Sequence, residues 1–294
     1  MNGYLSGGLA SYSPQDNRLI NFGGFGQTEN MVSTDQFLYL VVYTKSVIYK
    51  YDPNRPFEFD RSNVNEAKNP KKLFSLDEYG QDRPFGMEQG NGKIYIGTVP
   101  SYGKLGGALT IYDEKTDKYE VYRNIVNNQS VVSLRYHDGL VYGSTSVFGG
   151  LGIKPTEEEA KVFIFDPVRK EKIYEGVPLP GEKAISTLEY GDKGNLWGMS
   201  PGKIFKFDIE KKKVIHSQEL FPFNWKDISN YWRGADLLYV KDGLFYGVTQ
   251  GNLFSYDSKS EKMKILGTGV SLIEADDKGH IFVTKGTKLY QLIY

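Results

Sequence analysis

The chain has 294 residues, enough for one large domain or two ordinary ones, and its 36 basic residues balance 36 acidic ones. A net charge of zero argues against a nucleic-acid groove or an anionic membrane as the main partner, and no apolar run is long enough to predict a membrane span. The absence of cysteine excludes disulfides, thiol catalysis and zinc–thiolate sites, while 22 Tyr, 17 Phe and 33 Gly indicate aromatic strands joined by glycine turns.

One five-residue pattern recurs along the chain: an apolar residue, an aromatic residue, any residue, an aromatic residue and Asp. Its clear copies are Ile48–Asp52, Leu109–Asp113, Val162–Asp166, Ile204–Asp208 and Leu253–Asp257, with degenerate copies at Leu9–Ser13 and Leu289–Ile293. Most copies are separated by roughly 40 to 50 residues, a period typical of propeller blades. Period-2 alternation, as in Ile204–Phe207, favours strands over helices.

A second pattern precedes each copy: a turn with Gly or Asp, two or three residues, then an aromatic residue and often Gly. Its copies begin at Asn2, Asp35, Asn91, Asp138, Lys193, Asp242 and Lys278. Each pair of patterns predicts a four-stranded blade. Strand A is the apolar run before the glycine turn, strand B holds the second pattern, strand C holds the first, and strand D follows a turn that begins with Asp.

The sequence therefore predicts an all-β fold, a single seven-bladed β-propeller over residues 1–294 with four-stranded antiparallel blades. Strand A is missing from the first blade and strand D from the last, so both are expected to be incomplete. These ends indicate a domain excised from a longer protein, or a ring that closes without the missing strands. Six blades with extra strands are the alternative fold. The polar segment 53–70 is expected to be a solvated insertion between strands C and D.

In a propeller the D–A and B–C loops share one face, which surrounds the mouth of the central channel and commonly holds ligands. The candidate ligand-binding residues on this face are Asn30, Arg83, Tyr102, Gln129, Tyr231, Trp232 and Arg233. Flat rings with hydrogen-bond donors suit a sugar, and arginines suit the carboxylate of an acidic sugar. The three histidines fall in different blades, so no metal site is expected.

The copies lack the Gly-His and Trp-Asp pairs of WD40 blades and the double glycines of kelch blades. The chain instead resembles the quinoprotein-like and YVTN-type propellers of bacteria. The stretches GTVPSYGKLGGALTIYD and GSTSVFGGLGIKPTEEEAKVFIFD are similar to propeller regions of large secreted bacterial proteins, several of them active on polysaccharides. This resemblance and the lack of cysteine favour an extracellular location, with a cytoplasmic one as the alternative. No cofactor is expected, because the chain has no adjacent cysteine pair and no clear calcium cluster.

Three functions are consistent with these features. The first is a binding module, for a carbohydrate or a protein, on the D–A and B–C face. The second is a polysaccharide lyase or hydrolase acting on uronate-containing glycans, since propeller lyases use His or Tyr as the base and Arg to neutralise the uronate. The third is a scaffold within a larger protein. The first and third rank above the second, and the chain is expected to be a monomer or part of a multidomain protein.

Overall fold

A computed structural model describes residues 8–276 and 278–293. In this range the structure consists of β-strands and three short 3₁₀ helices, η1 (Arg61–Asn63), η2 (Asp77–Tyr79) and η3 (Asp192–Gly194). None of these helices is long and apolar enough to cross a membrane. The chain divides into two compact units, Met1–Val131 with Gly149–Ile153, and Val132–Phe148 with Lys154–Tyr294. Each unit is described by itself below.

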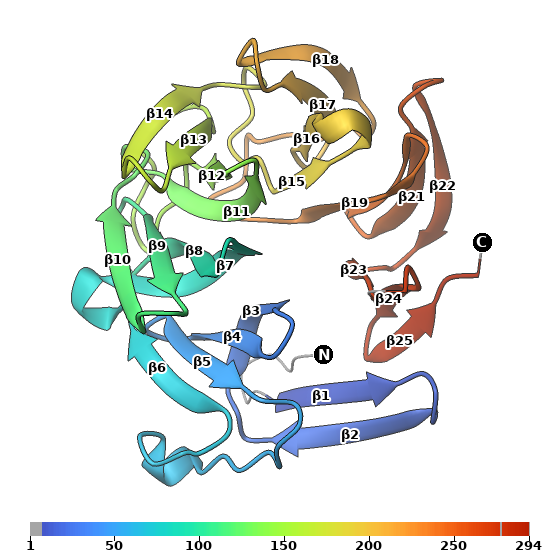
Figure 1. Ribbon diagram of the computed structural model, residues 1–294. Coiled ribbons are helices and arrows are strands. Elements are labelled where there is room, and N and C mark those ends of the chain that lie inside the picture. The colour runs from blue at the N-terminus through green and yellow to red at the C-terminus, as the bar shows by residue number, and fades with distance from the viewer. Residues whose placement is uncertain (1–7, 277, 294) are drawn as a thin grey trace. The chain divides into compact units, whose positions relative to one another are not determined.

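The first unit contains a two-stranded hairpin and two four-stranded antiparallel sheets. The hairpin pairs β1 (Gly8–Ser13) with β2 (Arg18–Gly23). The first sheet consists of β3 (Gln27–Ser33), β4 (Leu38–Tyr43), β5 (Val47–Tyr51) and β6 (Lys71–Ser75). The second consists of β7 (Gln81–Gly90), β8 (Lys93–Pro100), β9 (Ala108–Asp113) and β10 (Lys118–Arg123). In both sheets the strands lie side by side in chain order (Figure 1).

The second unit contains the remaining sheets, again with the strands in chain order. The first of them consists of β11 (Ser130–His137, which enters this unit at Val132), β12 (Leu140–Ser146), β13 (Val162–Asp166) and β14 (Glu171–Gly176). The next consists of β15 (Thr187–Tyr190), β16 (Leu196–Met199), β17 (Lys203–Asp208) and β18 (Lys213–Glu219). The third consists of β19 (Ala235–Lys241), β20 (Leu244–Thr249), β21 (Asn252–Asp257) and β22 (Lys262–Thr268). The fourth consists of β23 (Leu272–Ala275), β24 (Ile281–Lys285) and β25 (Lys288–Gln291).

These sheets are β-propeller blades, and the described residues contain six of them, five four-stranded and one three-stranded. The predicted all-β propeller of four-stranded antiparallel blades is confirmed, and the count matches the alternative of six blades with extra strands. The difference arises at Leu9–Ser13, expected as strand C of a further blade. This segment lies in β1, which pairs with β2 alone among the described strands. The second-pattern copy at residues 2–7 lies outside the described residues.

The glycine and aspartate turns form as the sequence predicts. The two-residue turns Asn91–Gly92 and Asp138–Gly139 have positive φ at both residues (52° and 69°, 47° and 82°). This conformation matches the twist of antiparallel strands. The aspartate that ends strand C caps the next turn, since Asp113 Oδ1 accepts hydrogen bonds from the N–H groups of Lys115 and Thr116.

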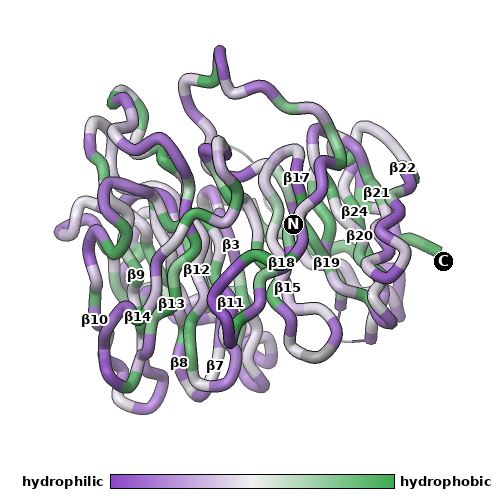
Figure 2. The backbone as a smooth tube through the Cα atoms, turned by 90° about the horizontal axis from the view of Figure 1, so that it is seen from above, coloured by the Kyte–Doolittle hydropathy of each residue, from purple (hydrophilic) through white to green (hydrophobic). Residues whose placement is uncertain are grey.

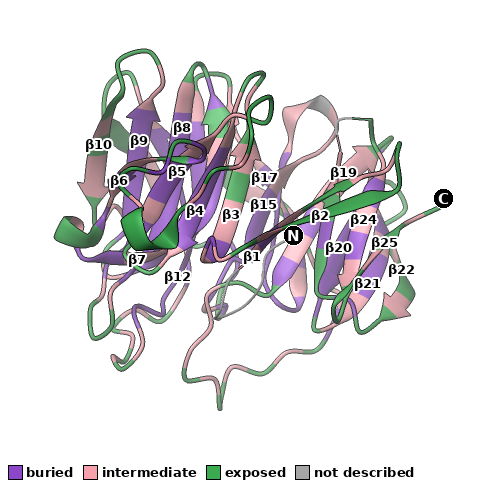
Figure 3. Ribbon diagram, turned by 90° about the horizontal axis from the view of Figure 1, so that it is seen from below, coloured by how far each residue is buried: buried purple, intermediate pink, exposed green. Residues whose placement is uncertain are grey.

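The hydrophobic core lies between neighbouring sheets of each unit. Tyr39 and Ile48 of the first sheet share one buried cluster with Met87 and Ile94 of the second. In the second unit Trp197 is buried, with its ring 5.2 Å from that of Phe245 in the next sheet. Figure 2 shows hydrophobic residues along β9, β12 and β13. Figure 3 shows β8 and β9 largely buried and β2 exposed.

The two repeated sequence patterns meet across strands B and C. The glycine of the second pattern stands directly opposite an aromatic residue of the first in three blades: Gly143 and Phe163, Gly198 and Phe205, Gly247 and Phe254. A Cβ atom at Gly143 would lie 2.1 Å from Cζ of Phe163. The ring therefore occupies the space that a side chain would need, which explains why the two patterns recur together.

The insertion between β5 and β6 is confirmed, but it is packed rather than simply solvated. The Phe57 ring stacks on Phe22 of the hairpin at 4.5 Å, and Phe59 packs edge-to-face against Phe25 at 4.8 Å between ring centroids. At its end the buried Asn69 side chain donates hydrogen bonds to the backbone carbonyls at 52, 55 and 56. The aromatic residues that interrupt the polar segment thus anchor it to the first sheet and the hairpin.

Candidate functional site

The candidate residues from the sequence fall into two groups, one in each unit. Asn30, Arg83, Tyr102 and Gln129 belong to the first unit, and the run 231–233 belongs to the second. Arg83 lies near the start of β7, Tyr102 follows β8 and the run 231–233 precedes β19, whereas Asn30 lies in the middle of β3.

Arg83 stands at the centre of the first group, near the start of β7. Its Nη1 lies 3.0 Å from Oε1 of Glu29, and the two side chains are only 11% and 7% exposed. The same Glu29 oxygen accepts a hydrogen bond from Nε2 of Gln27 at 2.8 Å. The guanidinium carbon lies 3.7 Å from the ring centroid of Tyr43, within the range of a cation–π interaction. The charge of Arg83 is therefore balanced by a carboxylate and covered by a ring.

Tyr102 completes this group and is its most accessible member. The residue is 52% exposed. Its hydroxyl accepts a hydrogen bond from Nη2 of Arg83 at 3.4 Å and lies 3.2 Å from the hydroxyl of Tyr43. We call Gln27, Glu29, Tyr43, Arg83 and Tyr102 the Arg83 site.

Two irregularities of the sheets help to place the charged pair. The register of β3 with β4 shifts between Thr28 and Asn30, so Glu29 has no residue directly opposite. A similar shift between Gln81 and Arg83 occurs where β7 pairs with β8. Bulges of this kind redirect side chains at the ends of strands and are common beside functional sites.

The loop that carries Tyr102 is fixed by backbone contacts. Ser101 N–H donates to the carbonyl of Gly80, and Gly103 N–H donates to that of Leu151, both at 2.8 Å. A Cβ atom at Gly150 would lie 2.1 Å from the carbonyl oxygen of Ser101. The glycines in the segment Gly149–Ile153 therefore allow two backbones to approach closely, and Tyr102 is presented from a preorganised loop.

The two tyrosines of the site differ in acidity. Hydrogen bonds from Tyr43 and Arg83 stabilise the ionised form of Tyr102 and lower its pKa. The pKa of Tyr43 is raised to about 12, first by its hydrogen bond to Tyr102 and then by burial. The pair therefore holds one proton-releasing hydroxyl at the surface and one that stays protonated beneath it.

A tyrosinate absorbance titration checks this asymmetry. We expect the Tyr102→Phe variant to lose an early ionisation step, because the hydroxyl with the lowered pKa is gone. The pKa of Tyr43 should then fall from about 12 toward its ordinary value, since the hydrogen bond that raises it most is lost. An unchanged titration curve in Tyr102→Phe would contradict the coupling.

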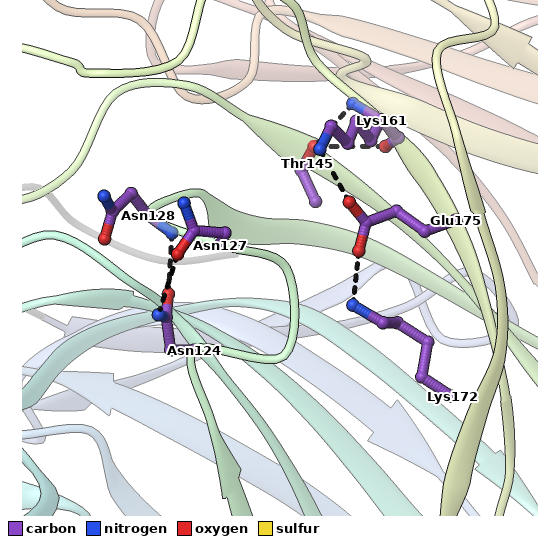
Figure 4. A network of polar contacts seen from close by, with 7 residues as sticks. All are labelled: Asn124, Asn127, Asn128, Thr145, Lys161, Lys172 and Glu175. Atoms are coloured by element: carbon purple, nitrogen blue, oxygen red, sulfur yellow. Dashed lines mark hydrogen bonds and ion pairs between the residues drawn. The ribbon is translucent and has the colours of Figure 1, made fainter.

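The other two candidates of the first unit serve contacts within the protein. Asn30 lies inside β3 rather than in a loop, and its Nδ2 donates to the carbonyl of Phe85 at 2.6 Å. Gln129 is fully buried, and its backbone carbonyl accepts a hydrogen bond from Gly107 N–H. The turn before Gln129 is held by Asn124, which accepts from Asn128 N–H at 2.7 Å (Figure 4).

In the second unit, the candidate Tyr231 belongs to an aromatic cluster. Its ring packs edge-to-face on Phe223 and Trp225 at 5.6 and 5.3 Å between centroids, and burial raises its pKa to about 12. The indole Nε1 of Trp225 donates to the buried Glu182, which also pairs with Lys203 at 2.8 Å. These contacts hold the aromatic side chains of the 220–234 loop against one another and against Glu182. Trp232 is half-buried and Arg233 is exposed beside it.

A long B–C loop of the same unit is closed at its base by polar contacts. Lys161 N–H donates to Oγ1 of Thr145 at 2.8 Å, and its ammonium group donates to Glu175 at 2.6 Å. Lys172 also donates to Glu175 (Figure 4). Burial of Glu175 opposes ionisation, but the hydrogen bonds from the two lysines outweigh it and lower its pKa.

Sequence reasoning missed Tyr43 and Gln27 as members of the Arg83 site. Both stand at strand ends, and the register pairs them directly across β3 and β4. The available signal was the position of Tyr43 as the last residue of strand B, immediately before the B–C loop. The histidines, in contrast, make local contacts in the second unit, such as His216 Nε2 with the Tyr256 hydroxyl at 3.0 Å.

No protein-family model matches the chain, and no curated protein sequence matches it. The structure supports the resemblance to known propellers at the level of the fold, and no particular propeller family is shown.

Proposed function

We propose that the protein is a propeller binding module that binds a carbohydrate at the Arg83 site. The observation that carries this proposal is the exposed ring of Tyr102 on a fixed loop, with its hydroxyl bonded to Tyr43 and Arg83. An aromatic face covers the apolar face of a sugar ring, while neighbouring hydroxyl and guanidinium groups hydrogen-bond its hydroxyls. Preorganisation of the loop lowers the entropic cost of binding.

The ion pair within the site bears on the charge of the ligand. Arg83 already pairs with Glu29 at 3.0 Å, so its charge is balanced before any ligand arrives. A carboxylate on the sugar would have to compete with a buried glutamate for the same guanidinium group. This arrangement favours ligands that present hydroxyl groups over ligands that require a free cation.

Glycan-array binding with matched tyrosine variants tests the proposal. We expect Tyr102→Ala to weaken binding at least about tenfold, because it removes the exposed ring, and Tyr102→Phe to weaken it less. Tyr12→Ala is the control, since Tyr12 is also an exposed tyrosine (39%) of the first unit but lies in β1, outside the site. Equal binding by wild type and Tyr102→Ala, or no glycan bound at all, would refute the proposal.

A polysaccharide lyase is the second candidate, because Tyr102 has a lowered pKa and touches an arginine. In such a reaction the Tyr102 phenolate would take the C5 proton of a uronate, and the C4–O bond would break as the C4–C5 double bond forms. The resulting Tyr102 phenol would then give that proton to the departing oxygen. Its signature is new absorbance from the unsaturated uronate, abolished in Tyr102→Phe. The binding proposal expects none of this absorbance across a panel of polyuronates.

A further inference from the structure

A separate cavity of about 340 Å³ lies in the first unit. Its lining comes from the last residues of β5, the insertion, the start of β6 and the turn after β9. These are the A–B and C–D ends of the two sheets, whereas the Arg83 site lies at the D–A and B–C ends. The cavity is therefore distinct from the proposed carbohydrate site.

Four basic side chains line the cavity. Its four basic residues are Lys50, Arg55, Lys68 and Lys71, and none of them forms an ion pair with another described residue. Arg55, Lys68 and Lys71 are exposed, so solvent and solutes reach them.

Three carboxylates also line the cavity, and each accepts a hydrogen bond from a neutral donor. Glu114 accepts a hydrogen bond from the hydroxyl of the buried Tyr39, and Asp117 accepts one from that of Tyr112, both at 2.7 Å. Asp52 caps its own turn by accepting the N–H of Asn54 at 2.9 Å. These neutral donors leave the three carboxylates charged, so the lining carries four cations against three anions and keeps an excess of one positive charge.

Two of the lysines are placed directly against each other. Lys50 of β5 stands opposite Lys71 of β6 in the strand register, and both line the cavity. Like charges at directly opposed positions destabilise a sheet. The ammonium group of Lys50 also lies 3.7 Å from the ring centroid of Phe37, which fixes its position in the cavity wall. An anion between the two lysines would remove their repulsion.

We propose that this cavity binds a small organic phosphate. The lysines and Arg55 supply the donors that a phosphate group with two negative charges requires. Phe37 and Leu73 supply an apolar wall for the organic part. The buried Asn69 donates to the carbonyl of Arg55 at 3.1 Å and thereby fixes the backbone from which the guanidinium group extends.

Calorimetric titration with phenyl phosphate, inorganic phosphate and phenol tests this proposal on the whole chain at low salt. We expect phenyl phosphate to bind with a dissociation constant of about 1 mM or tighter. Inorganic phosphate should bind more weakly and phenol should not bind. Phenyl phosphate should also raise the melting temperature, because it binds the folded state alone.

Lysine variants separate a built site from a general attraction to positive charge. Lys50→Gln and Lys71→Gln should each weaken phenyl phosphate binding at least about fivefold. Neither should lower the melting temperature of the free protein, because each removes the repulsion. Lys115→Gln is the control, since Lys115 lies in the nearby turn but not in the cavity lining. No binding up to about 10 mM, or an equal loss in Lys115→Gln, would overturn the proposal.

Discussion

Replacing Gly143 with alanine is expected to lower the free energy of unfolding by about 3 kcal/mol, because the new Cβ would overpack a filled core. The three atoms nearest to that Cβ all belong to the ring of Phe163, at 2.1, 2.2 and 2.9 Å. Phe163 is fully buried and has no room to withdraw. Chemical denaturation of wild type and variant measures this loss of unfolding free energy. Both curves are fitted with the same dependence of the free energy on denaturant concentration.

A second substitution shows whether the ring causes this loss. Phe163→Leu shortens the side chain opposite Gly143, so the double variant should lose less stability than the sum of the two single losses. The matched control is Gly267→Ala in β22, where no atom lies within 4 Å of the added Cβ. A loss in Gly267→Ala as large as that in Gly143→Ala would attribute the effect to glycine in general and contradict the packing explanation.

Replacing Arg83 with alanine is expected to cost about 3 to 5 kcal/mol of folding stability, the usual penalty for leaving one charge of a buried pair unpaired. Glu29 would keep the hydrogen bond from Gln27 but lose the guanidinium group at 3.0 Å. The same variant should lose glycan binding, because Tyr102 would lose one of the two groups that hold its hydroxyl.

The double variant Arg83→Ala with Glu29→Gln separates these two effects. Removing both charges should recover most of the stability but not the glycan binding. Lys45→Ala is the control for ion pairs, since Lys45 and Asp77 pair at 3.0 Å with side chains 60% and 55% exposed. Such an exposed pair contributes about 0 to 1 kcal/mol. If Lys45→Ala destabilises as much as Arg83→Ala, burial of the Arg83 pair is not what makes it important.

The blade structure was predictable because each blade repeats two local signals. Turns such as Asn91–Gly92 need positive φ, and the five-residue pattern marks strands such as Val162–Asp166, so sequence alone places the strands to within a few residues. The number of blades could not be predicted from local sequence patterns. Leu9–Ser13 matches the strand pattern, but its pairing partners decide whether it completes a blade, and they lie in β2.

The sequence predicted on which loops the Arg83 site lies, but not which side chains contact one another there. The loop order placed Arg83 and Tyr102 at the same end of one sheet, and the structure brings them together. The bulge that sets Glu29 beside Arg83 has no sequence signature in a single chain. Gln129 has a polar side chain in a loop, yet it is buried, because burial depends on neighbours distant in sequence.

The central claim, a carbohydrate site around Arg83, is tested most directly by a crystal structure of the chain soaked with neutral and acidic oligosaccharides. We expect sugar density against the ring of Tyr102, with hydroxyls bonded to Tyr43 or Arg83 and the Glu29–Arg83 pair intact. Density at another surface, or a sugar carboxylate that displaces Glu29 from Arg83, would contradict it.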